Sequence, residues 1–142
     1  MLRPFAFWDS SVLVPLCVSE AQTPQSLRFQ SKYQMAVWWT THVEIASALV
    51  RVLRHHKITP SEYAHATLQA EGLANLWRVV APSKSVALQA RSLLESYSLR
   101  AADALQLAAA LTWCEGKPKG NVFRPNSRKT VILSEALHGS IA

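Results

Sequence analysis

The fold is decided by the stretch FAFWDSS at residues 5–11, in which four apolar residues lead directly into an acid and two serines. A short apolar run bounded by polar turn residues predicts a buried β-strand. Working outward from it, the sequence predicts a second strand at residues 36–40 and a third at residues 78–81. Residues 121–123 and 131–133 are candidates for two further short strands.

Segments with apolar residues at helical spacing separate these strands. Helices are predicted at residues 12–18, 23–32, 41–57, 59–77, 82–97 and 101–113. Alternation of strands and helices predicts an α/β fold in which helices cover both faces of a mostly parallel sheet. Because the sequence has no internal repeat and no low-complexity linker, we expect one domain over residues 1–142, with an atypical stretch at residues 116–142.

The composition excludes several classes of protein. The 142 residues carry a formal net charge of +6, with 49% hydrophobic and 17% charged residues, which is not the profile of a disordered chain. Two cysteines, Cys17 and Cys114, provide neither a disulfide framework nor a zinc-binding spacing, so we expect free thiols. Because the sequence has no apolar run of about 18 residues, we expect no membrane-spanning segment and no membrane partner.

The acidic residues are placed unusually. The chain has only two aspartates, Asp9 and Asp103, and both stand in apolar segments. Asp9 ends the first predicted strand, Glu44 lies in the first turn after the second, and Asp103 lies near the start of the most apolar helix. Because ligands gather at the carboxyl ends of parallel strands, Asp9 and Glu44 are expected to converge there, and Asp103 joins them if its helix also starts there. Three converging carboxylates suit a hard divalent cation such as Mg²⁺.

Each of these acids also has a purely structural interpretation. Asp9 is suited to cap the next helix, Glu44 to close a capping box with Thr41, and Asp103 to favour the positive end of a helix dipole. Spacing in the sequence does not choose between these roles and a shared metal site.

Three segments resemble the motifs of PIN-domain ribonucleases. They are FWDSSVLV at residues 7–14, THVEIASAL at residues 41–49 and LRAADALQLAAA at residues 99–110, of which the third is the most specific. Their order and spacing also fit over about residues 5–124, and the resemblance is greatest to the VapC-type toxins of bacterial toxin–antitoxin pairs. It implies a three-layer α/β/α sandwich with a central, mostly parallel sheet. It also implies an endoribonuclease that uses Mg²⁺ or Mn²⁺ to activate the water that cleaves RNA.

The resemblance also implies roles for individual residues. Asp9, Glu44 and Asp103 would be the catalytic metal ligands, and Ser11 would support the site through its hydroxyl, although a local turn role for Ser11 fits equally well. The implied partners are RNA, a cognate antitoxin and a second copy of the chain, in the cytoplasm. Candidate RNA contacts lie in the basic C-terminal stretch, at Lys117, Lys119, Arg124, Arg128 and Lys129.

Two tryptophans just ahead of the second motif are further candidates for RNA contacts. Trp38 and Trp39 are suited to stack on unpaired bases, although paired aromatics in a strand also suit a core or an interface.

One part of the chain departs from the family pattern. The family usually places a fourth acid shortly after the strand that contains Phe123, whereas Asn126 or Ser127 stands near that position here and residues 116–134 contain no acid. The alternative function is therefore a non-catalytic PIN-fold module that binds RNA or the antitoxin. Phosphotransfer through Asp9 is a third, weaker hypothesis, because that chemistry usually has a second aspartate at the position of Ser11.

Overall fold

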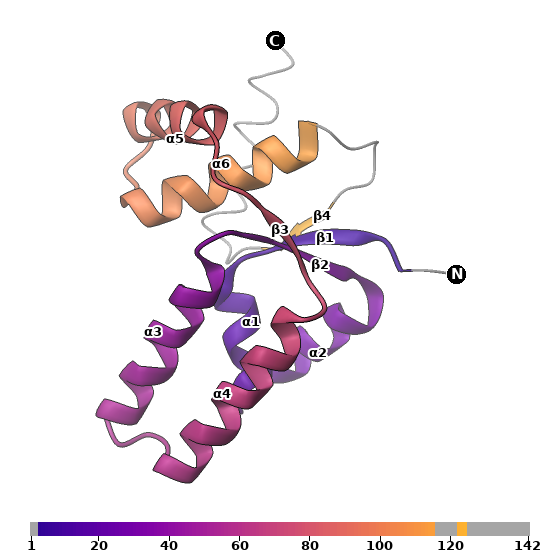
Figure 1. Cartoon of the computed structure of the whole chain (residues 1–142), viewed down its shortest axis with the longest axis vertical. Coiled ribbons are helices and arrows are strands. Elements are labelled where there is room, and N and C mark those ends of the chain that lie inside the picture. Colours follow the sequence, from indigo (N-terminus) through magenta and orange to yellow (C-terminus); the bar gives the residue numbers. More distant parts are fainter. Residues whose placement is uncertain (1–2, 116–121, 125–142) are drawn as a thin grey trace.

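The computed structural model describes residues 3–115 and 122–124 of the chain. Four strands and six helices lie within these residues (Figure 1). In chain order they are β1 (Phe5–Trp8), α1 (Ser10–Cys17), α2 (Thr23–Lys32), β2 (Gln34–Trp38), α3 (Thr41–Arg54), α4 (Pro60–Ala74), β3 (Arg78–Val80), α5 (Lys84–Ser96), α6 (Ala101–Glu115) and β4 (Val122–Arg124).

The strands form one parallel sheet with the order β3-β2-β1-β4. The central strand β1 pairs with β2 in a register that places Phe7 opposite Ala36, and with β4 in a register that places Phe7 opposite Phe123. From β1 the chain adds β2 and β3 on one side and then returns to add β4 on the other. The sheet therefore changes its direction of growth at β1, the strand that carries Asp9 at its end.

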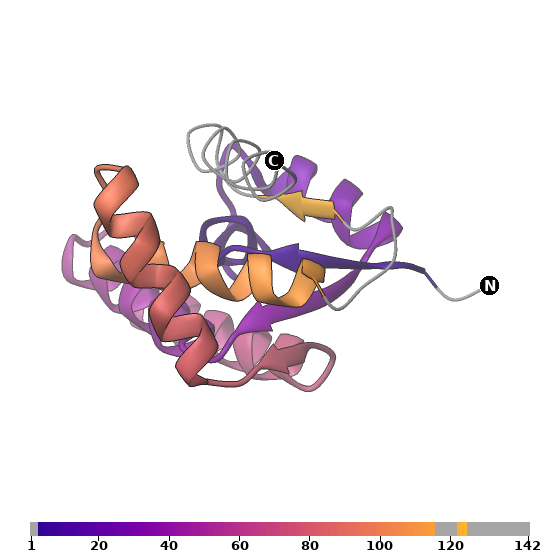
Figure 2. The same ribbon diagram turned by 90° about the horizontal axis from the view of Figure 1, so that it is seen from above.

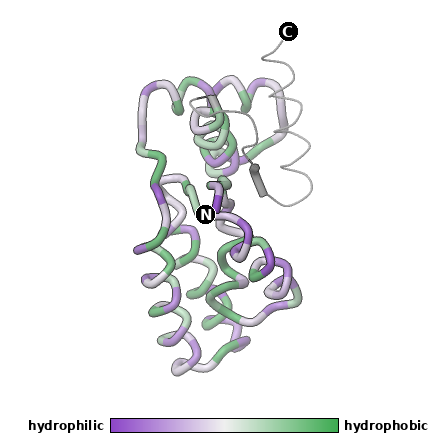
Figure 3. Tube along the Cα trace, turned by 90° about the vertical axis from the view of Figure 1, so that its right-hand side faces the viewer, coloured by the Kyte–Doolittle hydropathy of each residue, from purple (hydrophilic) through white to green (hydrophobic). Residues whose placement is uncertain are grey.

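Helices cover both faces of the sheet, so the molecule has three layers. Helices α1 to α4 lie below the sheet in Figure 1 and α5 and α6 lie above it. Figure 2 shows from above that α6 lies over β1, with α5 beside α6. Figure 3 shows apolar and polar residues alternating along the helices of the lower layer, as expected for helices with one buried face.

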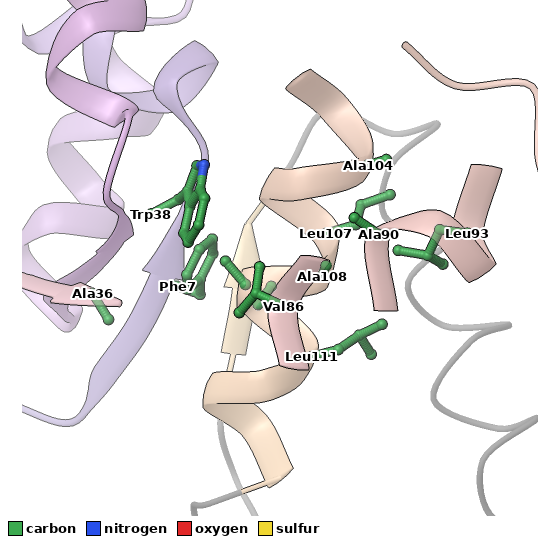
Figure 4. Close-up of a cluster of buried hydrophobic side chains, with 12 residues drawn as sticks. Phe7, Ala36, Trp38, Val86, Ala90, Leu93, Ala104, Leu107, Ala108 and Leu111 are labelled. Atoms are coloured by element: carbon green, nitrogen blue, oxygen red, sulfur yellow. The ribbon is translucent and has the colours of Figure 1, made fainter. Parts of the chain in front are cut away.

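Alternate residues of β1 and β2 enter the two cores. From β1, Trp8 packs with the core beneath the sheet and Phe7 with the core above it. Both side chains are fully buried, which explains why the strand has no polar face. The upper core places Phe7 and Trp38 against α5 and α6 (Figure 4).

Helix α6 is the most deeply buried helix of the upper layer. Its side chains from Leu107 to Ala110 are fully enclosed, and α5 packs along it. Small alanine side chains allow α6 to lie close to the sheet and to α5 at once, which explains its apolar composition on nearly all sides.

The predicted three-layer α/β/α architecture with a parallel sheet is confirmed. The boundaries of β2 differ from the prediction, because the strand spans Gln34–Trp38 rather than residues 36–40. Trp39 and Thr40 form the turn into α3 instead. The strand expected at residues 121–123 is present as β4, and the one expected at residues 131–133 lies outside the described residues.

Candidate functional site

Asp9 lies at the carboxyl end of β1 and begins helix α1. Its side chain is fully buried, and its Oδ2 atom accepts hydrogen bonds from the backbone N–H of Ser11 at 3.2 Å and from the Ser11 hydroxyl. Asp9 therefore has its predicted capping role. The Ser11 hydroxyl contacts the Asp9 carboxylate, while its support of a metal site stays a prediction. Burying an ionised carboxylate is costly unless other groups compensate its charge, which two local donors do in part. Capping alone does not require a buried aspartate, since caps are usually solvent-accessible.

Glu44 lies in the first turn of α3 but does not close a capping box with Thr41, so that structural interpretation is wrong. The residue before the helix is Thr40, which has helical dihedral angles and makes no side-chain cap. The helix thus begins one residue earlier than a box at Thr41 requires. The half-buried Glu44 carboxylate instead accepts a hydrogen bond from the side-chain amide of Gln106 on α6.

Asp103 lies in the first turn of α6 and is half-buried. An acid at this position is favoured by the positive end of the helix dipole, as the sequence predicts. Gln106 follows three residues later, and residues three apart share one face of a helix. Asp103 therefore lies on the side of α6 that turns toward Glu44.

The topology brings the segments that carry the three acids to one edge of the sheet. Strands β1 and β2 are parallel neighbours, so Asp9 and the start of α3 follow the same edge. Helix α6 leads into β4, which is parallel to β1, so α6 begins at that edge too (Figure 1). This edge flanks the point where the sheet changes its direction of growth, which is where open α/β sheets bind ligands.

The donor chemistry at this edge suits a hard cation. Asp9, Glu44 and Asp103 offer only carboxylate oxygens, the ligands that Mg²⁺ and Mn²⁺ prefer. Within residues 3–115 and 122–124, we find no group of three or more His, Cys, Asp or Glu side chains placed closely enough to hold a metal ion. A shared metal site for the three acids therefore stays a prediction, supported by their chemistry and by the edge they occupy.

The other predicted site residues lie mostly beyond the described part of the chain. Arg124 ends β4, and its backbone pairs with Trp8. Outside the described residues lie Lys117, Lys119, Asn126, Arg128 and Lys129.

One feature of the site was missed in the sequence. Gln106 joins α6 to α3, and the signal for it was a single amide within the otherwise apolar run from Ala104 to Ala110.

A cavity of about 390 Å³ lies between α3 and α4. Its lining is mainly apolar and comprises His42, Ile45, Ala46, Leu49, Tyr63, Thr67, Ala70, Glu71, Ala74 and Trp77.

Cys17 is a poor candidate for a competing nucleophile. It forms no disulfide within the described residues and is buried in the lower core. Burial raises the pKa of the Cys17 thiol from 9.0 to about 11, so the reactive thiolate is scarce at neutral pH.

Comparisons with known proteins also indicate a ribonuclease-like relative. No model of a known protein family matches the chain. It is 29% identical over 109 residues to "Ribonuclease VapC45" of Mycobacterium tuberculosis (strain CDC 1551 / Oshkosh), covering 76% of both chains. It is equally similar, over the same length, to "Ribonuclease VapC49" of Mycobacterium tuberculosis (strain ATCC 25618 / H37Rv).

A solved structure shares the fold. A chain of a "Toxin-antitoxin complex from Klebsiella pneumoniae" superposes with a TM-score of 0.55 at 20% sequence identity. The match covers 77% of this chain and 80% of that one. No helix within the described residues is long and apolar enough to cross a membrane.

Proposed function

Because the resemblance of this chain to VapC-type ribonucleases of the PIN-domain family is confirmed, we propose that it is a ribonuclease toxin that cleaves RNA. One observation in the structure carries the proposal. Three acids that are far apart in the sequence follow the same edge of the sheet, and Glu44 on α3 is held by a side chain of α6, one turn beyond Asp103. A merely structural set of helix caps gives no reason for a hydrogen bond between these two helices at that point.

We assign the acids to a divalent metal. Asp9, Glu44 and Asp103 would hold Mg²⁺ or Mn²⁺, and such an ion lowers the pKa of a bound water and stabilises negative charge on a phosphate. The chain's own contribution is placement. Ser11 holds one oxygen of Asp9 through two hydrogen bonds, and the basic stretch from Lys117 to Lys129 would hold the phosphates of the RNA strand.

Replacing the acids tests the proposal. We expect Asp9→Asn, Glu44→Gln and Asp103→Asn each to reduce cleavage of a mixed RNA substrate by at least about a hundredfold, since each removes a metal ligand's charge. Cleavage should require Mg²⁺ or Mn²⁺, stop with EDTA and leave 5′-phosphate ends. Glu95→Gln, at an exposed position on α5, is the matched control and should cleave normally.

The acid-free stretch after Phe123 favours a second candidate function. If no residue replaces the fourth acid of the family, the chain is a non-catalytic module that binds RNA or an antitoxin. RNA binding without cleavage at any Mg²⁺ or Mn²⁺ concentration would establish this alternative and contradict the nuclease.

We assign the antitoxin to the cavity between α3 and α4. Its walls are apolar and aromatic, and an apolar groove between two helices accepts an amphipathic helix of a partner. The solved structure that shares this fold comes from a toxin–antitoxin complex, which supports a partner of this class. We further propose that the chain forms a homodimer and acts in the cytoplasm, where RNA is accessible; light scattering tests the dimer.

A further inference from the structure

The most unusual side chain outside the three acids is Gln106. It is 1% exposed and lies in the first half of α6, where its neighbours from Ala104 to Ala110 are otherwise apolar. A primary amide carries two donors and an acceptor, and burying one is unfavourable unless its hydrogen bonds are made. The burial of the Gln106 amide therefore requires an explanation.

The hydrogen bonds of Gln106 point to Glu44. Its Nε2 donates to Oε2 of Glu44 and to the hydroxyl of Thr41 at 3.4 Å. An ionised carboxylate only accepts hydrogen bonds, so the amide must present its NH₂ group to Glu44 and its oxygen elsewhere. One amide thus joins the start of α3 to α6 and contacts the Glu44 carboxylate directly.

The oxygen of the same amide is not satisfied. Oε1 of Gln106 is buried and has no hydrogen-bond partner among the described residues. Leaving a buried acceptor unpaired costs about 1–3 kcal/mol. A glutamine that served stability alone would be a poor choice here, because leucine fills similar space without this cost.

We propose that Gln106 is the positioning residue of Glu44, which holds that carboxylate in the orientation needed to bind the divalent cation. The inference rests on the proposed function. It adds a residue outside the three acids, and Gln106 acts through Glu44 rather than by touching the substrate. Neutral donors of this kind direct a ligating carboxylate without neutralising its charge, and their removal typically weakens metal affinity by about tenfold to a hundredfold.

The first test is Mn²⁺ binding to the full chain without RNA, measured by isothermal titration calorimetry. We expect Gln106→Leu to raise the Kd for Mn²⁺ by about tenfold to a hundredfold with little change in the melting temperature of the metal-free protein. The matched control is Gln89→Leu, which removes the hydrogen bond from Thr112 to Gln89 at 3.1 Å between α5 and α6. Gln89→Leu should leave the Kd for Mn²⁺ unchanged.

A double variant shows whether Gln106 acts through Glu44. If it does, Gln106→Leu should have no further effect on Mn²⁺ affinity in the Glu44→Gln background. Additive losses, or a Kd for Gln106→Leu equal to that of the unaltered chain, would overturn the proposal.

Metal-free crystal structures separate this proposal from the proposed function. In Gln106→Leu we expect the Glu44 side chain to adopt another rotamer, whereas in Gln89→Leu it should not move. An unchanged Glu44 in Gln106→Leu overturns the positioning role whatever the metal data show. An unaltered chain that binds no Mn²⁺ contradicts the metal site, and the rotamer of Glu44 then decides alone whether Gln106 positions it.

Discussion

Two adjacent tryptophans have opposite environments. Trp38, the last residue of β2, is 4% exposed and packs in the upper core, whereas Trp39 is 52% exposed in the turn that follows. The side chains of successive strand residues point to opposite faces of the sheet. Because Trp39 lies just beyond the end of β2, its side chain packs in neither core. The sequence offered both as candidates for stacking on RNA bases. Only Trp39 is accessible for that role, and it lies at the edge that carries the acids.

Alanine substitutions should separate these two roles. We expect Trp38→Ala to destabilise the fold by about 3–5 kcal/mol, because it removes a large buried side chain. Trp39→Ala should leave the melting temperature nearly unchanged and weaken RNA binding by about 1–3 kcal/mol, the contribution of one stacked base. Thermal denaturation and RNA titration by fluorescence anisotropy measure the two effects. Unchanged RNA affinity in Trp39→Ala would remove this residue from the RNA-binding surface.

At the scale of elements, helices α3 and α4 form an antiparallel pair that leaves part of its shared surface open. Thr59 and Glu62 form a capping box at the start of α4, a helix that the sequence predicts. Leu49 and Leu73 are buried in the lower core, and Leu49 also lines the cavity together with the half-buried Tyr63 and Trp77. The apolar surface between the two helices thus belongs partly to the core and partly to an open groove.

Filling this groove should block the antitoxin without affecting catalysis. Ala70 lines the cavity, so Ala70→Trp should occupy it and abolish co-purification with a cognate antitoxin. Ala64→Trp, on the same helix but not in the lining, is the control and should still bind. Both variants should cleave RNA, because neither touches the acids. Antitoxin retained by Ala70→Trp would place its binding site on another surface.

The elements also show what the sequence can predict. Apolar runs and helical spacing identified each described strand and helix, because hydrophobic periodicity is a local signal. They misplaced the limits of β2, because Trp39 and Thr40 are apolar or β-branched and yet form a turn. The candidate metal ligands Asp9 and Asp103 were identified in the sequence because each stands among apolar residues. The bond from Gln106 to Glu44 was not, because it joins residues 62 positions apart and only the tertiary fold brings them together.

At the scale of the whole molecule, one parallel sheet organises both proposed activities. The segments that carry Asp9, Glu44 and Asp103 follow its carboxyl edge, and its lower layer presents the α3–α4 cavity. Helix α3 takes part in both, since its first turn carries Glu44 and its length forms one wall of the cavity. A partner seated in that cavity would therefore contact the helix that holds a predicted metal ligand.

The central claim is that the three acids form one metal site, and a crystal structure of the full chain soaked in Mn²⁺ tests it most directly. Manganese is identified by its anomalous scattering, so its position does not depend on the interpretation of weak density. We predict one or two Mn²⁺ ions at the carboxyl edge of the sheet, contacted by Asp9, Glu44 and Asp103. Mn²⁺ bound only to other residues, or no Mn²⁺ at this edge at a saturating concentration, would contradict the account.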